Sequence, residues 1–196
     1  MLPLFLIFLS YVFGSIPTGF IVAKKNNVDI RKVGSGNIGA TNILRTFGLK
    51  FAVPVALFDF LKGLVPTLLA SLLGFDQISI GLVALAAIVG HVFPLFLKFR
   101  GGRGVATYGG TLFVILGIKY IVIIFVIWFA ILILTKLMSL TNLLLSLAIP
   151  ILVFCLIHNT FYALYTIAGA LFIWWTHRPN IKRLLEGSEK RLNLTK

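Results

Sequence analysis

Acidic residues and cysteines are scarce in this chain of 196 residues. Five Asp and Glu stand against eighteen Lys and Arg, which gives a formal net charge of +13. A two-metal phosphotransferase needs several carboxylates close together, and so few acids do not supply them near the polar motifs. The single cysteine, Cys155, excludes a disulfide within the chain and a CxxC metal site. The sequence therefore predicts no metal site and no cofactor.

Hydrophobic residues, in contrast, are abundant. They make up 59% of the chain, whereas a soluble domain is about 45–50% apolar. In a soluble protein, the excess of basic residues would suggest a nucleic-acid partner. Here the basic residues cluster at the ends of apolar blocks, which is typical of the cytoplasmic loops of membrane proteins. We therefore expect a polytopic protein that contacts a lipid bilayer and no nucleic acid.

The sequence contains seven apolar blocks. A membrane-spanning helix needs about 20 residues, so the short fourth and fifth blocks could form one long helix. Basic residues fill both the first connection and the chain after Thr176, and the positive-inside rule requires an even number of crossings between them. Breaks at 117–119 and 158–159 give six. We expect an all-α fold of seven transmembrane helices, with the N-terminus outside and the C-terminus cytosolic, in a single domain, 1–196. The blocks are residues 2–23, 51–74, 77–97, 104–118, 119–135, 140–157 and 159–176.

The first block has no basic residues before it, and no small-residue cleavage pattern precedes Lys24. We therefore expect a retained span and not a removable signal peptide. The run GSIPTG at residues 14–19 interrupts this block and predicts a kink, because proline breaks helical hydrogen bonding. The predicted topology brings four polar segments to the cytosolic face: residues 24–50, the turn around 101–107, residues 136–142 and the chain from His177.

The first polar segment contains the run GSGNIGATN at residues 34–42, followed by Arg45. Small residues and short amide or hydroxyl side chains suit a tight backbone that holds an oxygen-rich ligand, and arginine adds a planar fork that matches phosphate. An ordinary turn between helices has a similar composition, and this alternative stays open. The candidate substrate-binding residues are Gly34, Asn37, Gly39, Thr41, Asn42 and Arg45, and Ser35 is a candidate catalytic residue.

The second polar segment is the run GGRGVAT at residues 101–107. Glycines allow backbone N–H groups to approach an anion closely, and an arginine between them supplies a fixed positive charge. The alternative is a tight cytosolic turn. The candidate substrate-binding residues are Gly101, Gly102, Arg103, Gly104 and Thr107.

The last of these polar segments begins with HRPN at residues 177–180. His177 lies where the last apolar block meets water and is a candidate acid or base, because imidazole titrates near neutrality. Arg178 is a candidate for binding anionic groups, and Asn180 is a candidate catalytic residue. For residues 181–191 we expect an amphipathic helix on the membrane surface.

The second and third apolar blocks contain ionisable residues in their interiors. Asp59 and Lys62 are three residues apart, and this spacing predicts an ion pair on one face of a helix. His91 stands alone, and we expect it to be hydrogen-bonded within the helical bundle.

Together these segments resemble the bacterial acyl-phosphate glycerol-3-phosphate acyltransferase family, small integral-membrane enzymes that make lysophosphatidic acid. The runs GSGNIGATN with Arg45, GHVFPLFLKFRGGRGVAT from Gly90 and HRPNIKRLLEGSE from His177 stand in the family's order and spacing. The resemblance covers essentially the whole chain, with one departure at Arg103, where the family usually carries lysine. It implies acyl transfer from acyl phosphate to the 1-hydroxyl of glycerol 3-phosphate with release of inorganic phosphate. This is the first step of phospholipid synthesis, at the cytosolic face of the bacterial inner membrane.

The implied reaction brings two phosphate-bearing reactants together, which explains the cations and the glycine-rich turns. On this hypothesis Arg103 and its neighbouring glycines hold one phosphate. Arg45 and Asn42 hold the other.

The remaining candidates act on the reacting groups. Ser35, Asn37 and Asn180 orient the reactants and stabilise the oxyanion. The proton of the attacking hydroxyl goes to His177 or to the substrate phosphate, and both alternatives stay open.

A small transporter or channel for an anionic metabolite is the rival hypothesis. Transporters place broken helices near the bilayer midplane and often contain inverted repeats. The polar motifs of this chain gather at one face, which favours the enzyme.

Overall fold

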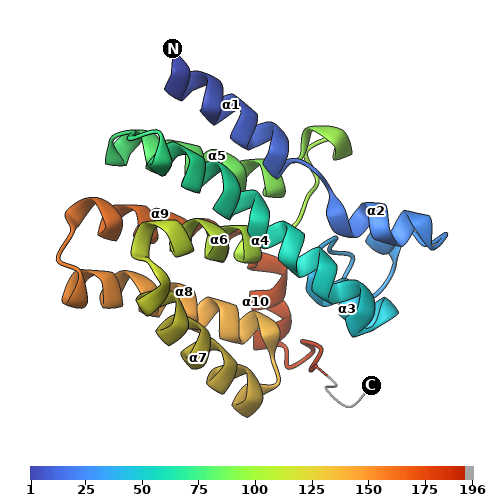
Figure 1. Ribbon diagram of the computed structural model, residues 1–196. Coiled ribbons are helices and arrows are strands. Elements are labelled where there is room, and N and C mark those ends of the chain that lie inside the picture. Colours follow the sequence, from blue (N-terminus) through green and yellow to red (C-terminus); the bar gives the residue numbers. More distant parts are fainter. Residues whose placement is uncertain (193–196) are drawn as a thin grey trace. The chain divides into compact units, whose positions relative to one another are not determined.

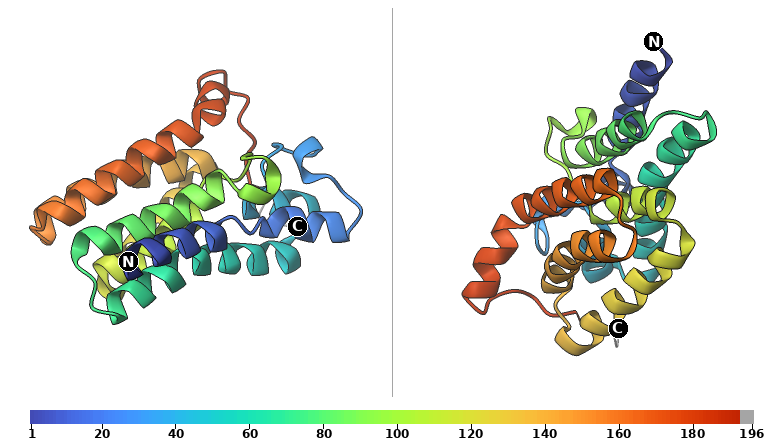
Figure 2. Two further views of the ribbon diagram at one scale, coloured as in Figure 1. Left: turned by 90° about the horizontal axis from the view of Figure 1, so that it is seen from above. Right: turned by 90° about the vertical axis from the view of Figure 1, so that its left-hand side faces the viewer.

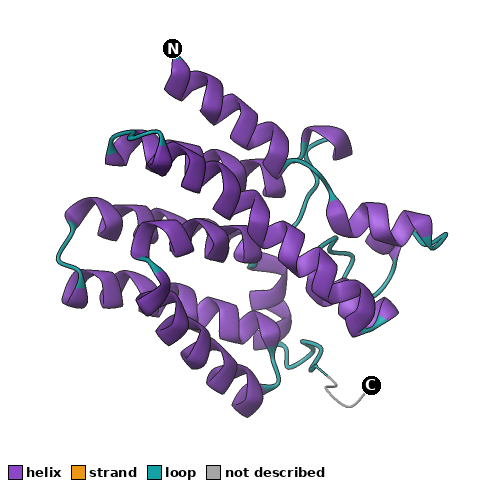
Figure 3. Ribbon diagram, in the orientation of Figure 1, coloured by secondary structure: helices purple, strands orange, loops and turns teal. Residues whose placement is uncertain are grey.

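The computed structural model describes residues 1–192, which form helices joined by short connections (Figures 1 and 3). No β-strand occurs in this range, so the all-α prediction is confirmed. The chain divides into two compact units, residues 1–114 and the residues from 115 onward. The α-helices are α1 Leu2–Gly14, α2 Thr18–Lys25, α3 Ala40–Phe47, α4 Leu49–Leu72, α5 Gln77–Val92, α6 Val105–Leu116, α7 Ile118–Thr135, α8 Met138–Leu156, α9 Thr160–Thr176 and α10 Arg178–Leu185, and the 3-10 helices are η1 Ile30–Lys32 and η2 Leu95–Leu97.

In the first unit, α1 lies along α5 (Figure 2), and glycines let the two backbones approach closely. A Cβ atom at Gly14 would overlap the carbonyl oxygen of Ala87, and one at Gly90 would overlap the backbone of α1. The Ser10 hydroxyl donates to the carbonyl oxygen of Val83 at 2.7 Å. Small residues and hydroxyls join helices in this way in membranes, where apolar side chains gain little by leaving lipid.

The first apolar block is kinked as the sequence predicts. α1 ends at Gly14, and α2 begins at Thr18 after Pro17, which has no N–H to continue the helix. The chain then passes close to the first polar segment, because a Cβ atom at Gly19 would overlap the carbonyl oxygen of Ile38. The kink therefore brings α2 against the segment that carries the first motif.

Residues 24–50 were expected to be a polar connection, but they contain a helix of their own, α3. Its apolar residues Ile43, Leu44 and Phe47 join a core that includes Ala52 and Val55 of α4. This spacing places them on one face of a helix. α3 is only eight residues long, and packing against α4 is what stabilises it.

Within residues 1–192, five stretches are long and apolar enough to cross a membrane: Leu2–Lys25, Leu49–Leu72, Gln77–Leu97, Ile118–Thr135 and Met138–Leu156. The helices α6 and α9 are also apolar but have only 12 and 17 residues. The chain breaks between helices at Gly117, where φ is +80°, and at 158–159, as the sequence predicts. The number of crossings and the orientation of the termini stay predictions.

In the second unit, α8 packs against α7 and α9, and α10 contacts α8 and α9. Trp128 Nε1 of α7 donates to Asn142 Oδ1 of α8 at 2.9 Å. α10 ends at Leu185 and Gly187 turns the chain with φ +67°, so the amphipathic helix expected over residues 181–191 is shorter than predicted. Beyond the turn the chain folds back, and the N–H of Leu192 donates to the carbonyl oxygen of Lys136 at 2.7 Å.

Candidate active site

The side chain of Asn42 holds the first polar segment together. Its Oδ1 accepts a hydrogen bond from the backbone N–H of Ser35 at 2.9 Å, and its Nδ2 donates to the carbonyl oxygens of Ile30 and Val33 at 3.2 and 2.9 Å. The residue is fully buried, and both amide hydrogens are in use. This geometry favours a positioning role for Asn42 over the direct substrate contact expected from the sequence.

Two glycines allow the backbone conformation of this segment. Gly34 and Gly36 have φ values of +65° and +72°, which other residues rarely adopt. A Cβ atom at Gly34 would also overlap Asn42 Oδ1. Before them, Asp29 caps η1, and hydrogen bonding from Arg31 lowers the pKa of this carboxyl to about 2. The segment is therefore fixed ahead of α3.

The N-terminus of α3 is the part of this segment best suited to an anion. The first N–H groups of a helix have no partners within it and carry a partial positive charge. The N-cap residue, Gly39, has no side chain that could cap them, and the N–H of Asn42 donates to the Gly39 carbonyl oxygen at 3.0 Å. Ser35, Asn37 and Thr41 near this terminus are half-buried, and so is Arg45 in the last turn of α3.

The glycines of the second segment pack against the end of α5. The N–H of Gly101 donates to the carbonyl oxygen of Val92 at 3.0 Å, and that of Gly102 donates to the carbonyl oxygen of His91 at 3.1 Å. A Cβ atom at Gly102 would overlap the imidazole of His91. These two N–H groups are therefore already hydrogen-bonded within the protein. Gly101 and Gly102 allow close packing against α5, whereas the sequence suggested that their N–H groups bind an anion.

The remaining part of the turn leads directly into α6. Gly104 has φ +81° and precedes Val105, the first residue of the helix. Arg103 is half-buried at this N-terminus. A helix N-terminus preceded by an arginine is a suitable place for phosphate. Anion binding by Arg103 and the start of α6 stays a prediction.

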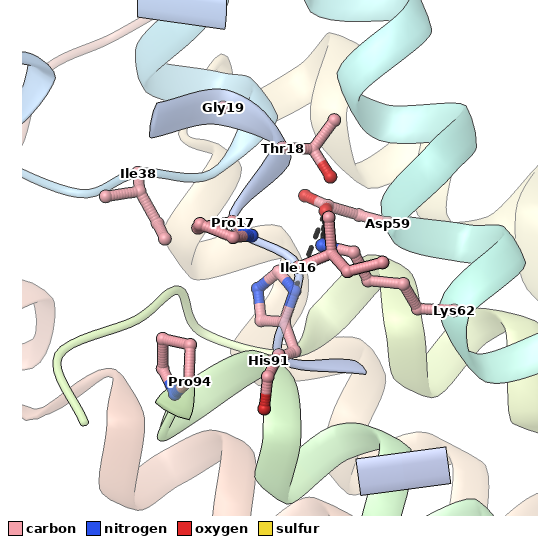
Figure 4. Close-up of a pocket in the computed structure, with 10 residues that line it drawn as sticks. Ile16, Pro17, Thr18, Gly19, Ile38, Asp59, Lys62, His91 and Pro94 are labelled. Carbon is pink, nitrogen blue, oxygen red and sulfur yellow. Dashed lines mark hydrogen bonds and ion pairs between the residues drawn. The ribbon is translucent and has the colours of Figure 1, made fainter. Parts of the chain in front are cut away.

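A small cavity lies beside the connection between α1 and α2, and an ion pair lines it (Figure 4). Lys62 Nζ donates to Asp59 Oδ1 at 2.5 Å, which confirms the predicted pair. His91 Nδ1 lies 3.7 Å from the same oxygen, too far for a hydrogen bond. Within residues 1–192, His91 Nδ1 and the Thr18 hydroxyl are buried without hydrogen-bond partners. The hydrogen bond expected for His91 is therefore not formed at this nitrogen.

Both glycine-rich segments contact the buried residues Asp59 and His91 or the cavity beside them. Ile38 of the first segment lines the cavity, and Gly102 of the second packs against the His91 ring. The Thr107 hydroxyl donates to the carbonyl oxygen of Asp59 at 2.8 Å and is fully buried. Thr107 therefore joins α6 to α4, where the sequence suggested substrate binding.

In the second unit, a backbone contact fixes the tautomer of His177. Its Nδ1 lies 2.8 Å from the carbonyl oxygen of Ile173. A carbonyl oxygen only accepts hydrogen bonds, so this nitrogen carries the proton, and the lone pair of the neutral ring lies on Nε2. Burial holds the ring in place, because only 1% of the residue is exposed. The role of His177 as an acid or base stays a prediction.

Close to His177 in the sequence, Glu189 forms a buried polar network that sequence reasoning did not find. Glu189 Oε1 accepts hydrogen bonds from Ser139 Oγ at 2.9 Å and Asn180 Nδ2 at 2.8 Å, and Oε2 accepts from Arg183 Nε at 2.7 Å. Burial raises the pKa of Glu189, but the hydrogen bonds from Arg183, Asn180 and Ser139 outweigh this and leave the pKa below its ordinary value. The sequence contained one indication of this network, because Glu189 is one of only five acidic residues in the chain.

Arg178 makes its contacts outside this network. Its guanidinium lies over the Trp175 ring, 4.9 Å from the centroid, and its Nε donates to the Trp175 carbonyl oxygen at 3.1 Å. The residue is exposed. Its role in binding anionic groups at the interface stays a prediction.

A sequence profile described as glycerol-3-phosphate acyltransferase matches residues 4–187. The chain belongs to this family. The glycerol-3-phosphate acyltransferase of Rubrobacter xylanophilus is 41% identical over 194 residues, which cover 97% of this chain and 96% of that protein. A protein of the same name from Thermus thermophilus is 45% identical over 184 residues, which cover 94% of this chain and 92% of that protein.

Similar solved structures come from the same family as the relatives found by sequence. Two crystal structures of PlsY, an integral membrane glycerol 3-phosphate acyltransferase, match 98% of this chain and 96% of their own. The glycerol 3-phosphate form has a TM-score of 0.93 at 36% identity, and the lysophosphatidic acid form has 0.90 at 35%. The chain is therefore an integral-membrane acyltransferase of lipid biosynthesis, which confirms the enzyme hypothesis over the transporter hypothesis.

Proposed function

We propose that the chain transfers the acyl group of an acyl phosphate to the 1-hydroxyl of sn-glycerol 3-phosphate. The products are 1-acylglycerol 3-phosphate (lysophosphatidic acid) and inorganic phosphate. Family membership over residues 4–187 carries the proposal, and the relatives named glycerol-3-phosphate acyltransferase support it. Acyl phosphate is favoured as the donor because two phosphate-bearing reactants account for the recurring pairs of helix N-termini and arginines.

The first unit supplies two places for phosphate. One is the N-terminus of α3 together with Arg45 from the last turn of that helix, and the other is the N-terminus of α6 with Arg103. Each combines a helix dipole with a guanidinium, and charge-assisted hydrogen bonds of this kind are the stronger ones in proteins. Ser35 and Asn37, on the segment that Asn42 fixes, orient the bound reactants. The glycines of the 101–104 turn support Arg103 by packing.

His177 is the proposed proton acceptor. In this mechanism, the 1-hydroxyl oxygen attacks the acyl carbon, His177 Nε2 takes the hydroxyl proton, and the bond from the acyl carbon to the phosphate oxygen breaks. Phosphate leaves with the electron pair of that bond, so no covalent enzyme intermediate is needed. The contact of Nδ1 with Ile173 supports this role, because it presents Nε2 as the base. The alternative acceptor is the substrate phosphate.

The decisive experiment is an assay of the purified chain in detergent. We expect lysophosphatidic acid and phosphate from acyl phosphate and glycerol 3-phosphate, in equal amounts by mass spectrometry and a phosphate assay. Acyl-CoA and acyl carrier protein should give no product as sole donors. Robust turnover with acyl-CoA would contradict the choice of donor, and no product with any donor would contradict the function.

We further propose that the chain is a single domain with seven crossings of the bacterial cytoplasmic membrane. Its N-terminus is outside, and its active site faces the cytosol. The positive-inside rule and the helix break at Gly117 support this topology. Reporters fused after Lys25, Arg103 and Lys196 should report the cytosol, and one after Lys119 should report the outside. A cytosolic signal at Lys119 would contradict seven crossings.

A further inference from the structure

The carboxylate of Glu189 is fully engaged by side chains from two helices. Ser139 of α8 and Asn180 of α10 donate to one oxygen, and Arg183 of α10 donates to the other. Only 5% of the Glu189 side chain is exposed. Three residues after Glu189, the backbone N–H of Leu192 donates to the carbonyl oxygen of Lys136 and attaches the chain just before the start of α8. With both oxygens held, the carboxylate has one orientation.

This carboxylate determines which way the amide of Asn180 points. An ionised carboxylate accepts hydrogen bonds and cannot donate them, so the NH₂ end of the amide must face Glu189. The amide oxygen, Oδ1, is then directed away from the network. It is buried and has no hydrogen-bond partner within residues 1–192. A buried acceptor without a donor is costly, so this oxygen marks a position for a donor from outside the protein.

We propose that Glu189 is a positioning residue that holds Asn180 with its amide oxygen toward the attacking hydroxyl of the acceptor substrate. This inference rests on the proposed function, in which the acceptor is glycerol 3-phosphate. The hydroxyl donates to Asn180 Oδ1 until its proton moves to the base. Asn180 therefore acts as a hydrogen-bond acceptor and not as an oxyanion donor.

The amide orientation can be tested by exchanging the charge between the two residues. In Glu189→Gln, the new amide keeps its oxygen on Arg183, which can only donate, so its NH₂ group faces Asn180. Asn180 must then turn its own oxygen inward and lose the substrate contact. In Asn180→Asp, two carboxylates face each other. Each single variant therefore removes the orientation in a different way.

The double variant Glu189→Gln with Asn180→Asp restores the orientation. The glutamine amide at position 189 donates to one oxygen of the new carboxylate at position 180, and the other oxygen of that carboxylate again faces the substrate. The Ser139 hydroxyl can rotate to accept from the new amide, so the hydrogen bonds of residue 189 with Ser139, residue 180 and Arg183 are all retained.

We expect each single variant to lower kcat by about ten- to a hundredfold, with a smaller change in the KM for glycerol 3-phosphate, as loss of a hydrogen bond in a charged network typically does. The double variant should exceed both single variants by at least about tenfold. Glu186→Gln is the matched control, because Glu186 is exposed and lies 3.9 Å from Lys182, beyond hydrogen-bond distance. It should keep the parental kcat.

The outcomes separate this inference from the proposed function. A folded Glu189→Gln variant with kcat within twofold of the parent would overturn the positioning role. If Glu189→Gln does not fold, the comparison of Asn180→Asp with the double variant decides, and a double variant no faster than Asn180→Asp would show a merely structural role. Absence of product from the parent chain would contradict the proposed function itself.

Discussion

Replacing Asp59 with asparagine tests how strongly the buried ion pair stabilises the first unit. Lys62 Nζ lies 2.5 Å from Asp59 Oδ1, and the two side chains are 1% and 4% exposed. Removing one partner of such a pair leaves an uncompensated buried charge, which costs about 3–5 kcal/mol. Asparagine keeps the shape of aspartate, so the loss is electrostatic and not a cavity. We expect Asp59→Asn to lower the free energy of unfolding by this amount.

A second substitution distinguishes charge from packing. In the double variant Asp59→Asn with Lys62→Met, no charge is left unpaired. Replacing a whole buried pair by residues of similar volume is often neutral or stabilising. We therefore expect the double variant to be more stable than Asp59→Asn by about 2 kcal/mol or more. The two effects are not additive, because the residues are in contact.

The assay is unfolding in detergent followed by circular dichroism at 222 nm, which reports helices in both units. Tryptophan fluorescence is less suitable, because Trp128, Trp174 and Trp175 all lie in the second unit. Glu186→Gln serves as the control, since an exposed pair contributes about 0–1 kcal/mol. An Asp59→Asn variant within about 1 kcal/mol of the parent would refute the reasoning. So would a double variant no more stable than Asp59→Asn.

Four further predictions concern other parts of the chain. Gly102→Ala should destabilise the protein by about 1–3 kcal/mol through overlap with the end of α5, whereas Gly109→Ala, which meets only ordinary contacts, should not, as denaturant titration will show. The folded pKa of Glu189 is lowered, so its stabilisation is present above the ordinary value of 4.5 and lost as pH falls through the folded pKa; the Tm difference between parent and Glu189→Gln should shrink on acidification, and a constant difference would contradict this. His177→Ala and His177→Gln should both lower kcat by roughly 10²–10⁴ in steady-state assays, and near-full activity of His177→Gln would exclude the base role. Arg103→Ala should lose about ten- to a hundredfold in kcat/KM and Arg103→Lys less, and equal activity of the alanine and parent forms would remove this residue from the site.

The helix boundaries were largely predictable, because glycine and polar residues mark the breaks. Gly117 separates α6 from α7, and residues 158–159 separate α8 from α9, as expected. α3 was missed because it is only eight residues long, and the packing of Ile43 and Phe47 against α4 is what stabilises it. The early end of α10 follows from Gly187, a signal that helical periodicity around it obscured.

The roles of site residues were harder to predict than their positions. A glycine that packs closely and a glycine that exposes its N–H to an anion look the same in a sequence, and Gly102 proves to be the first kind. Asn42 was expected to meet a substrate, but its partners are backbone groups up to twelve residues before it. Glu189 was overlooked because Ser139 lies 50 residues away in the chain. Contacts of this range follow from the fold and not from local pattern.

The Asp59–Lys62 pair of α4 lies close to both glycine-rich motifs of the first unit, residues 34–42 and 101–107. Gly19 of α2 approaches the backbone at Ile38, which lines the cavity beside the pair. Thr107 donates to the backbone carbonyl of Asp59 and fixes α6, whose N-terminus follows Arg103. Catalysis by pre-organised charge requires that such groups do not move when the reaction begins. The long apolar helix α4, which carries the buried charge pair, therefore supports both glycine-rich segments. Loss of the pair should therefore weaken catalysis even under conditions in which the helices remain folded.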